Sequence, residues 1–236
     1  MLLFVYKLNK KILLLTIAII LAISLALIGI VFPNNVESLS PLAKYTVVLD
    51  AGHGGIDVGA TGVNGTKESD LNLKYAFCLD YLLTSFGFNV VQTRTTQDGL
   101  YTSLKSGFKM EDMNKRKEII NSSNADLVIS IHMNKYPASS SKGAQVFYQS
   151  NSEQSEALAN AIQSMLYLNV ENARLSTQSG DFYICRCSSI TSVIIECGFL
   201  SNPLEEANLI NNSYMNNFCY TVLCGILKYF KFQGVD

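Results

Sequence analysis

Short runs of β-branched and apolar residues alternate along this chain with longer segments that have helical spacing. The strongest runs are Tyr45–Leu49, Asn89–Thr93 and Leu127–Ile131, and each is typical of a buried strand. Further strands are predicted at 144–148, 182–185 and 193–195, and helices at 68–86, 112–122, 155–168, 203–210 and 217–230. Alternation of this kind predicts a single α/β domain with a mostly parallel, mixed sheet flanked by helices.

The N-terminus carries an apolar segment of a different kind. Lys7, Lys10 and Lys11 precede an uncharged apolar run from Ile12 to Phe32. A bilayer-spanning helix needs about 20 apolar residues, whereas a cleavable signal peptide has a core of about 7–15. The length therefore favours an uncleaved signal-anchor helix over a cleaved signal peptide, and the basic flank places the N-terminus inside the cell.

These features divide the chain into three parts. Residues 1–32 form the signal-anchor or signal peptide, residues 33–43 a short linker with two prolines, and residues 44–236 one well-buried domain, which we expect to be exported. The chain has 18 basic and 19 acidic residues and a formal net charge of -1. It lacks the basic excess of a nucleic-acid binder, so we expect no nucleic-acid partner.

The six cysteines are compatible with disulfides in an exported protein, but their positions favour buried thiols. Most of them lie inside apolar runs, where cysteine packs as a small hydrophobic residue. Cys185 and Cys187 are predicted to share one face of a strand, where a bridge between them would be strained.

The chain contains two histidines, and each directly follows a predicted strand. His53 lies in the glycine-rich loop Asp50–Gly55, and His132 follows Leu127–Ile131. Ligands of open α/β sheets bind beyond the carboxyl ends of the strands, so neighbouring strands would bring both imidazoles together. Histidine nitrogen suits zinc, and a catalytic zinc typically takes three protein ligands and a water. Two unrelated structural histidines remain the alternative.

The third ligand of such a site would be a nearby carboxylate. Asp50, Asp57, Glu68 and Asp70 are the candidates. Glu68 begins a predicted helix just after the His53 loop, so its side chain can turn back towards the metal. Asp50 and Asp57 lie in glycine-rich turns, where aspartate usually bonds the local backbone. The glycines do not indicate a phosphate-binding loop, because neither G-x-G-x-x-G nor the lysine of a P-loop is present.

The run Ser192–Phe199 places the carboxylate of Glu196 at the end of a predicted strand of hydrophobic residues, where a charge is unexpected. Burying a charge is costly unless the charge is paired or neutralised. Beside a metal-bound water, a carboxylate can accept the water proton and pass it to the leaving amine. A structural ion pair with Arg186 or Arg116 is the alternative.

Several segments in order form a pattern that extends over nearly all of residues 44–236. They are Val47–Ala60, Glu68 with Leu71–Leu73, Arg116–Asn121, Ala125–Asn134 and Ile195–Asn202. Together they resemble the motifs of the zinc-dependent N-acetylmuramoyl-L-alanine amidases, the family called Amidase_3. The resemblance implies an α/β fold in which helices surround a mixed sheet.

The resemblance also implies roles for individual residues. His53, Glu68 and His132 would bind Zn²⁺, and Glu196 would be the catalytic glutamate. The expected reaction is hydrolysis of the amide that joins the lactyl group of N-acetylmuramic acid to L-alanine of the peptidoglycan stem peptide. We expect Arg186 to support the oxyanion of that reaction.

Within the family, the chain is similar to the germination-specific, CwlD-type amidases of spore formers. Tyr183–Arg186 and Cys197–Pro203 carry this finer resemblance. It implies a role in maturation of the spore cortex, where the stripped muramic acid becomes the muramic-δ-lactam needed for germination. The alternatives are a cell-separation or autolytic wall amidase, an inactive peptidoglycan-binding module, and a zinc peptidase that acts on the stem peptide itself.

These expectations also define the partners and the place of action. Peptidoglycan would be the substrate, and the membrane would be contacted through residues 1–32. We expect the protein at the outer face of the membrane, or in the cell-wall or spore-cortex space, either anchored or secreted. Because no wall-binding repeats are expected, an accessory or regulatory protein is a further expected partner, although no residue indicates one.

Overall fold

The computed structural model describes residues 10–31, 42–103 and 106–232. It divides into two compact units, Met1–Leu39 and Ser40–Asp236. In the first unit, α1 (Lys10–Val31) is helical, as the apolar N-terminal sequence predicts. None of the described helices has the combined length and hydropathy of a membrane-spanning segment. The predicted linker, 33–43, lies outside the described residues except for residues 42 and 43.

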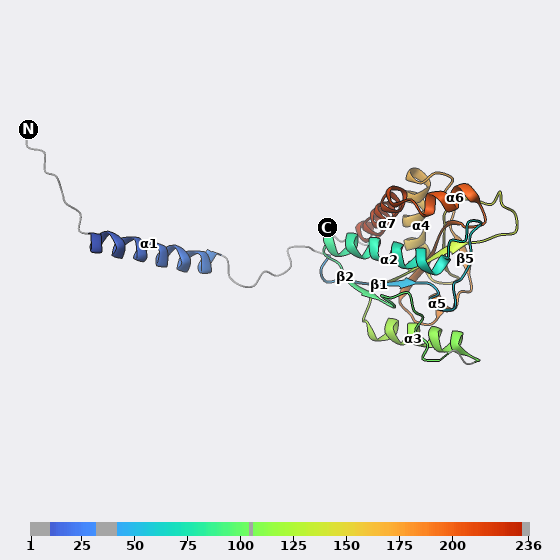
Figure 1. Cartoon of the computed structure of the whole chain (residues 1–236), viewed down its shortest axis with the longest axis horizontal. Helices are drawn as coiled ribbons and strands as arrows, with labels where there is room; N and C mark the ends of the chain where they lie inside the picture. Colours follow the sequence, from blue (N-terminus) through green and yellow to red (C-terminus); the bar gives the residue numbers. More distant parts are fainter. Residues whose placement is uncertain (1–9, 32–41, 104–105, 233–236) are drawn as a thin grey trace, which may run out of the picture. The chain divides into compact units, whose positions relative to one another are not determined.

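The described part of the second unit contains six strands and six helices (Figure 1). The strands are β1 (Thr46–Ala51), β2 (Asn89–Gln92), β3 (Leu127–Asn134), β4 (Gln145–Gln149), β5 (Gln178–Gly180) and β6 (Thr191–Phe199). The helices are α2 (Glu68–Ser85), α3 (Phe108–Ser122), α4 (Glu153–Asn169), α5 (Tyr183–Arg186), α6 (Pro203–Leu209) and α7 (Asn212–Phe232).

All six strands belong to one sheet, in the order β2-β1-β3-β6-β4-β5. The neighbours β2, β1, β3 and β6 run parallel to one another. β4 is antiparallel to β6, and β5 is parallel to β4. The predicted mixed, mostly parallel sheet is therefore confirmed, and the carboxyl ends of β1, β3 and β6 meet at one edge.

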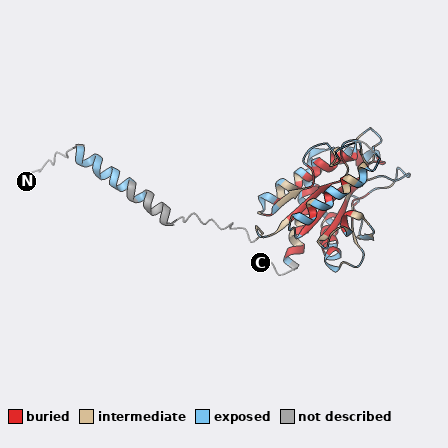
Figure 2. Ribbon diagram, turned by 90° about the horizontal axis from the view of Figure 1, so that it is seen from below, coloured by how far each residue is buried: buried red, intermediate tan, exposed pale blue. Residues whose placement is uncertain are grey.

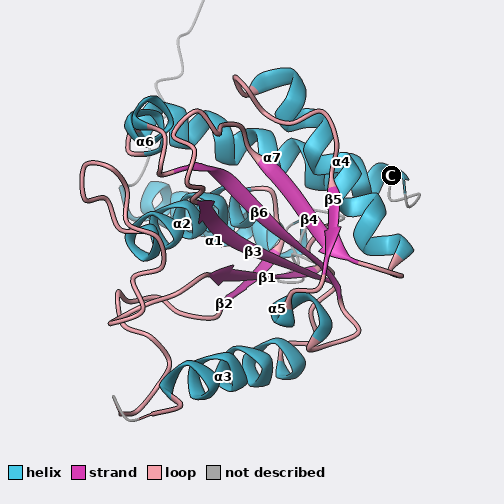
Figure 3. Cartoon of the chain, turned by 90° about the vertical axis from the view of Figure 1, so that its right-hand side faces the viewer, coloured by secondary structure: helices cyan, strands magenta, loops and turns pink. Residues whose placement is uncertain are grey.

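Helices cover both faces of the sheet: α2, α4 and α7 lie on one side, and α3 and α5 lie on the other (Figure 3). Side chains alternate between these faces along each strand. In β1, Val47 and Leu49 belong to the larger core, whereas Val48 packs with Val128 and Ile194 in a smaller core under α3 and α5. Figure 2 shows the strands buried between the helical layers. His132 and Glu196 follow Val128 and Ile194 by even steps, so they share the face of the smaller core.

Several elements differ from their predictions in type or boundaries: among them, α7 begins at Asn212 rather than at residue 217, and the short strand β5 was not predicted. Residues 182–185, predicted as a strand, form the short helix α5 instead, so Cys185 and Cys187 do not share a strand face. A helical turn lets the adjacent residues Ile184 and Cys185 both reach the smaller core, which the alternation of a strand would prevent. α3 begins at Phe108, four residues before the predicted start, directly after Gly107 in the left-handed region. All six cysteines are free thiols, three of them buried.

Gly225 lies in close contact with Ile162 of α4, and it provides a test of the packing of α7 on α4. A Cβ at Gly225 would lie 2.5 Å from Cα of Ile162. In an exposed helix, Gly→Ala stabilises by about 1 kcal/mol, but overpacking costs about 1–3 kcal/mol. We therefore expect Gly225→Ala to lower the free energy of unfolding in urea by about 1 kcal/mol. Ser213→Ala, at the exposed start of α7, is the control, and a gain in stability for Gly225→Ala would contradict the packing described.

Candidate metal centre

His53 occupies an unusual backbone conformation just beyond the end of β1. Its φ of 62° is left-handed, a region that residues other than glycine rarely adopt. The Arg116 guanidinium donates a hydrogen bond through Nη2 to the carbonyl oxygen of His53. The adjacent Gly52 has to lack a side chain, because a Cβ there would collide with the imidazole of His132. The loop therefore turns tightly and holds the His53 ring against His132.

Two buried arginines attach this loop to the rest of the domain. Arg116 donates through Nη1 to Asp50 Oδ1 at 2.6 Å and to the Ala51 carbonyl oxygen at 2.7 Å. Arg94 donates to the carbonyl oxygens of Ala51 and Gly52 at 2.8 and 3.0 Å. Both arginine side chains are almost fully buried. The carbonyl oxygens that a tight loop leaves without strand partners are thus satisfied, and the loop has one defined shape.

Asp50 is the buried counter-charge of Arg116. Thr93 and Ser130 donate hydroxyl hydrogen bonds to its two carboxylate oxygens at 2.8 and 2.6 Å. Burial raises the pKa of Asp50, but the Arg116 guanidinium and these hydroxyls outweigh it and lower the pKa to about 2. The sequence-based expectation that Asp50 bonds the local backbone is therefore wrong, because a buried arginine reaches it from α3.

This lowered pKa predicts a pH-dependent contribution to stability. An aspartate whose pKa is lower in the folded than in the unfolded protein stabilises the fold above its unfolded pKa, and this stabilisation is lost as the pH falls towards the folded pKa. For Asp50 the interval is from about 4 down to about 2, and its contribution is about 2 kcal/mol. The difference in unfolding free energy between wild type and Asp50→Asn should shrink over that interval in urea titrations. A difference that does not change with pH would contradict this assignment.

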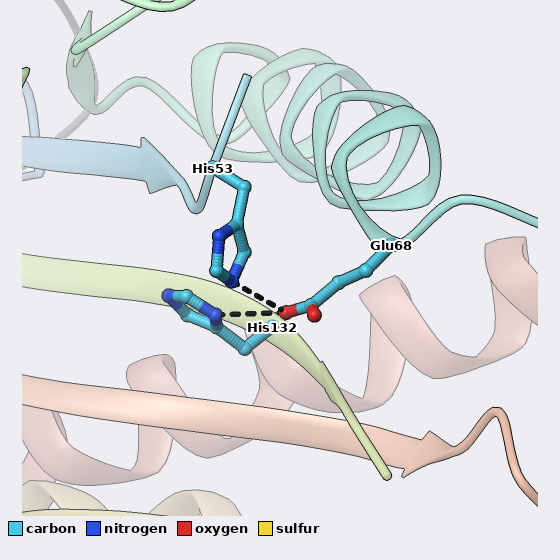
Figure 4. A group of neighbouring side chains, drawn as sticks. All are labelled: His53, Glu68 and His132. Carbon is cyan, nitrogen blue, oxygen red and sulfur yellow. Dashed lines mark hydrogen bonds and ion pairs between the residues drawn. The ribbon is translucent and has the colours of Figure 1, made fainter. Parts of the chain in front are cut away.

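Glu68 begins α2 and points into the same space as the two histidines (Figure 4). Its Oε1 lies 2.9 Å from Nδ1 of His132 and 3.3 Å from Nε2 of His53. The backbone N–H groups of Ala60 and Met133 donate to Oε2 and Oε1, at 2.7 and 3.2 Å. Burial raises the pKa of Glu68, but hydrogen bonds from both imidazoles outweigh it and lower the pKa. Glu68 is therefore held as a carboxylate whose position is fixed by the backbone.

His53, Glu68 and His132 together form a group that could hold a metal ion. One ligand atom from each residue lies within 4.8 Å of the other two. The two imidazole rings are 5.1 Å apart and nearly perpendicular, so their nitrogens converge with the carboxylate rather than stack (Figure 4). Two imidazoles and one carboxylate form a donor set that suits a divalent transition metal. The residues present thus fit a three-ligand site with room for a further, non-protein ligand.

Glu196 lies next to this group, on the neighbouring strand. It is the register partner of His132 in the parallel pairing of β3 with β6. Its Oε2 is buried and has no hydrogen-bond partner among the described residues. Burial, the largest influence, raises the pKa of Glu196 to about 6. The alternative of an ion pair is wrong for both candidate partners, because Arg116 pairs with Asp50 and Asp112, and Arg186 pairs with Asp181.

The structure does not bring Arg186 into this group. Its Nε lies 2.8 Å from Asp181 Oδ1, and its guanidinium lies 5.4 Å from the ring centre of Tyr183. The side chain is half exposed and lines a separate surface depression with Gln149. The local reason is the helical turn of α5, which directs Ile184 into the core and Arg186 towards solvent.

A cavity of about 320 Å³ opens beside the two histidines, on the face covered by α3 and α5. Its wall is mainly apolar and aromatic, formed by Tyr101, Phe108, Met113, Phe182, Tyr183, Ile184 and Ile194. Concave, mostly apolar pockets with a few convergent polar groups are typical of substrate sites. Asp57 also lines this cavity, and its Oδ2 lies 3.0 Å from Nδ1 of His53. The sequence did not predict this contact, since the Asp57 side chain was expected to bond the local backbone.

The family follows from comparison of the whole sequence with known proteins. Residues 47–228 match Amidase_3, described as N-acetylmuramoyl-L-alanine amidase. The chain belongs to this family. Family membership confirms the activity that the resemblance implied, hydrolysis of the N-acetylmuramoyl-L-alanine amide in peptidoglycan.

Individual relatives agree with this assignment. The chain is 36% identical to the germination-specific N-acetylmuramoyl-L-alanine amidase of Bacillus subtilis, over 82% of this chain and 83% of that protein. The solved CwlD amidase of Clostridioides difficile, in complex with the GerS lipoprotein, has a TM-score of 0.76 and 36% identity, covering 80% of this chain and 99% of that one. Another solved amidase, from Clostridium difficile 630, has a TM-score of 0.71 and 31% identity, covering 79% and 97%.

Proposed function

We propose that this amidase depends on zinc and cleaves between the lactyl group of N-acetylmuramic acid and L-alanine. One observation carries the proposal: His53, Glu68 and His132 offer converging ligand atoms beside the unpartnered carboxylate oxygen of Glu196. Two imidazoles and a carboxylate are a donor set found in catalytic zinc sites of hydrolases. No cysteine lies in the group, which favours a site for hydrolysis over a closed structural site.

The chain's own residues then provide the proton transfers. When bound, zinc lowers the pKa of a coordinated water towards about 7 and polarises the scissile carbonyl. Glu196 accepts the proton of the attacking water, since its Oε2 makes no competing hydrogen bond with any residue that the structure describes. It then returns that proton to the nitrogen of L-alanine, so the leaving group departs as a neutral amine. A raised pKa near 6 allows Glu196 to act as both base and acid near neutral pH.

The biological role that we propose is maturation of the spore cortex, where removal of stem peptides precedes formation of muramic-δ-lactam. The similarity to a germination-specific amidase supports this role. The alternative is a cell-separation or autolytic amidase.

We further propose that the domain acts outside the cytoplasmic membrane and works with an accessory protein. The lysines at positions 7, 10 and 11, followed by the apolar run Ile12–Phe32, support export. A relative solved in complex with a lipoprotein supports the accessory partner.

Digestion of peptidoglycan tests the reaction. The purified chain, supplied with zinc, should release stem peptides that begin with L-alanine and leave free muramic acid carboxyls on the glycan. A chelator should abolish this release. Mass spectrometry of the new termini distinguishes the amidase from a peptidase, which would cut within the stem. Binding of peptidoglycan by the zinc-loaded protein without any release would instead favour a binding module.

Substitution of Glu196 tests the assigned proton transfers. Glu196→Gln keeps the size of the side chain but cannot accept a proton, so kcat should fall by about 10²–10⁴-fold. The zinc content, measured by elemental analysis, should stay at the wild-type level, because Glu196 is not among the three converging ligands. Glu118→Gln, an exposed change on α3, is the control. A Glu196→Gln enzyme with near wild-type kcat would refute the role of Glu196.

A further inference from the structure

The carboxylate of Asp57 contacts the imidazole of His53 at the ring nitrogen that does not face Glu68. Nδ1 of His53 lies 3.0 Å from Oδ2 of Asp57, and Nε2 of the same ring lies 3.3 Å from Glu68. Nζ of Lys109, in the first turn of α3, donates to the other Asp57 oxygen, Oδ1, at 3.0 Å. Lys109, Asp57 and His53 are thus connected in series by hydrogen bonds, and the series ends at the three candidate metal ligands.

The carboxylate of Asp57 is not needed to hold its own turn. The backbone N–H of Gly54 donates to the carbonyl oxygen of Asp57 at 2.9 Å, and the N–H of Asp57 donates to the carbonyl oxygen of Gly54 at 3.2 Å. These two hydrogen bonds close the turn without the side chain of Asp57. Both side-chain oxygens of Asp57 are therefore left to bond His53 and Lys109.

The ion pair between Lys109 and Asp57 contributes little to stability. The Lys109 side chain is 67% exposed, and ion pairs between exposed side chains contribute little to the free energy of unfolding. Its consequence is geometric: with Oδ1 held by an ammonium group, Oδ2 faces the imidazole. When a metal takes the place of the Nε2 proton that faces Glu68, an acceptor at Nδ1 keeps the remaining proton on Nδ1 and leaves the lone pair on Nε2.

We propose that Asp57 is a positioning residue that directs the lone pair of His53 Nε2 towards the metal, and that Lys109 fixes the orientation of Asp57. This inference rests on the zinc-dependent function proposed above. It assigns to α3 a part in metal affinity, although no residue of α3 belongs to the three converging ligands.

An isosteric change of Asp57 is the first half of the test. In Asp57→Asn, the amide group cannot accept from both Lys109 and His53. With its oxygen on Lys109, its NH₂ faces Nδ1 and favours the imidazole form that has no lone pair on Nε2. The dissociation constant for zinc, measured by competition with a chromophoric chelator, should rise by about 10–100-fold. The melting temperature of the zinc-free protein should change little, because the backbone hydrogen bonds still close the turn.

Removal of the lysine is the second half. Lys109→Met alone should weaken zinc binding by only a few-fold, since Asp57 can still accept from His53. In Asp57→Asn/Lys109→Met, the amide oxygen no longer has an ammonium partner and is free to face Nδ1. The double variant should therefore bind zinc more tightly than Asp57→Asn alone. Lys115→Met, which removes another lysine of α3 that pairs with Glu118, is the matched control and should leave zinc affinity unchanged.

The possible outcomes distinguish failure of the zinc-dependent function from failure of the positioning role. If the wild-type protein binds no zinc, the proposed function fails, and the positioning role fails with it. If the wild type binds zinc and Asp57→Asn binds equally well, only the positioning role is overturned. A double variant that binds no better than Asp57→Asn would overturn the orienting role of Lys109.

Discussion

The buried guanidinium of Arg116 is the interaction on which the rest of the site depends. It connects α3 to the end of β1 by donating to the Asp50 carboxylate, the Ala51 carbonyl and the His53 carbonyl. Removing one partner of a buried ion pair typically costs about 3–5 kcal/mol, so a substitution of Arg116 or Asp50 should strongly destabilise the fold. The hydrogen bond from Arg116 to the His53 carbonyl oxygen holds the unfavourable left-handed backbone of that residue and sets the direction of its imidazole.

The topology of the sheet brings the remaining groups to the same place. β1, β3 and β6 are parallel neighbours, so the residues at their carboxyl ends lie side by side. His132 and Glu196 are directly paired across β3 and β6, which places a candidate base next to a candidate ligand without any loop. Glu68 enters from the first turn of α2, where the helix dipole favours a carboxylate. The chemistry is thus supported mainly by rigid elements.

Much of this arrangement could be predicted from the sequence, because its signals are local. His53, His132 and Glu196 each follow an apolar run that predicts a strand, and parallel strands place such residues at one edge of the sheet. Asp57 could not be assigned, because its partner Lys109 lies in a helical turn whose apolar periodicity is weak. The position of Arg186 could not be predicted for a similar reason: the β-prone residues at 182–185 form a helical turn that directs the arginine towards Asp181.

The central claim is that two histidines and one glutamate hold a single zinc ion beside Glu196. X-ray absorption at the zinc edge of the loaded protein tests this claim most directly, because the chain also offers six free cysteines. The three assigned ligands should give only nitrogen and oxygen neighbours around zinc, at about 2.0–2.2 Å, with the features of imidazole scattering. A sulfur contribution at about 2.3 Å would contradict the assigned ligands.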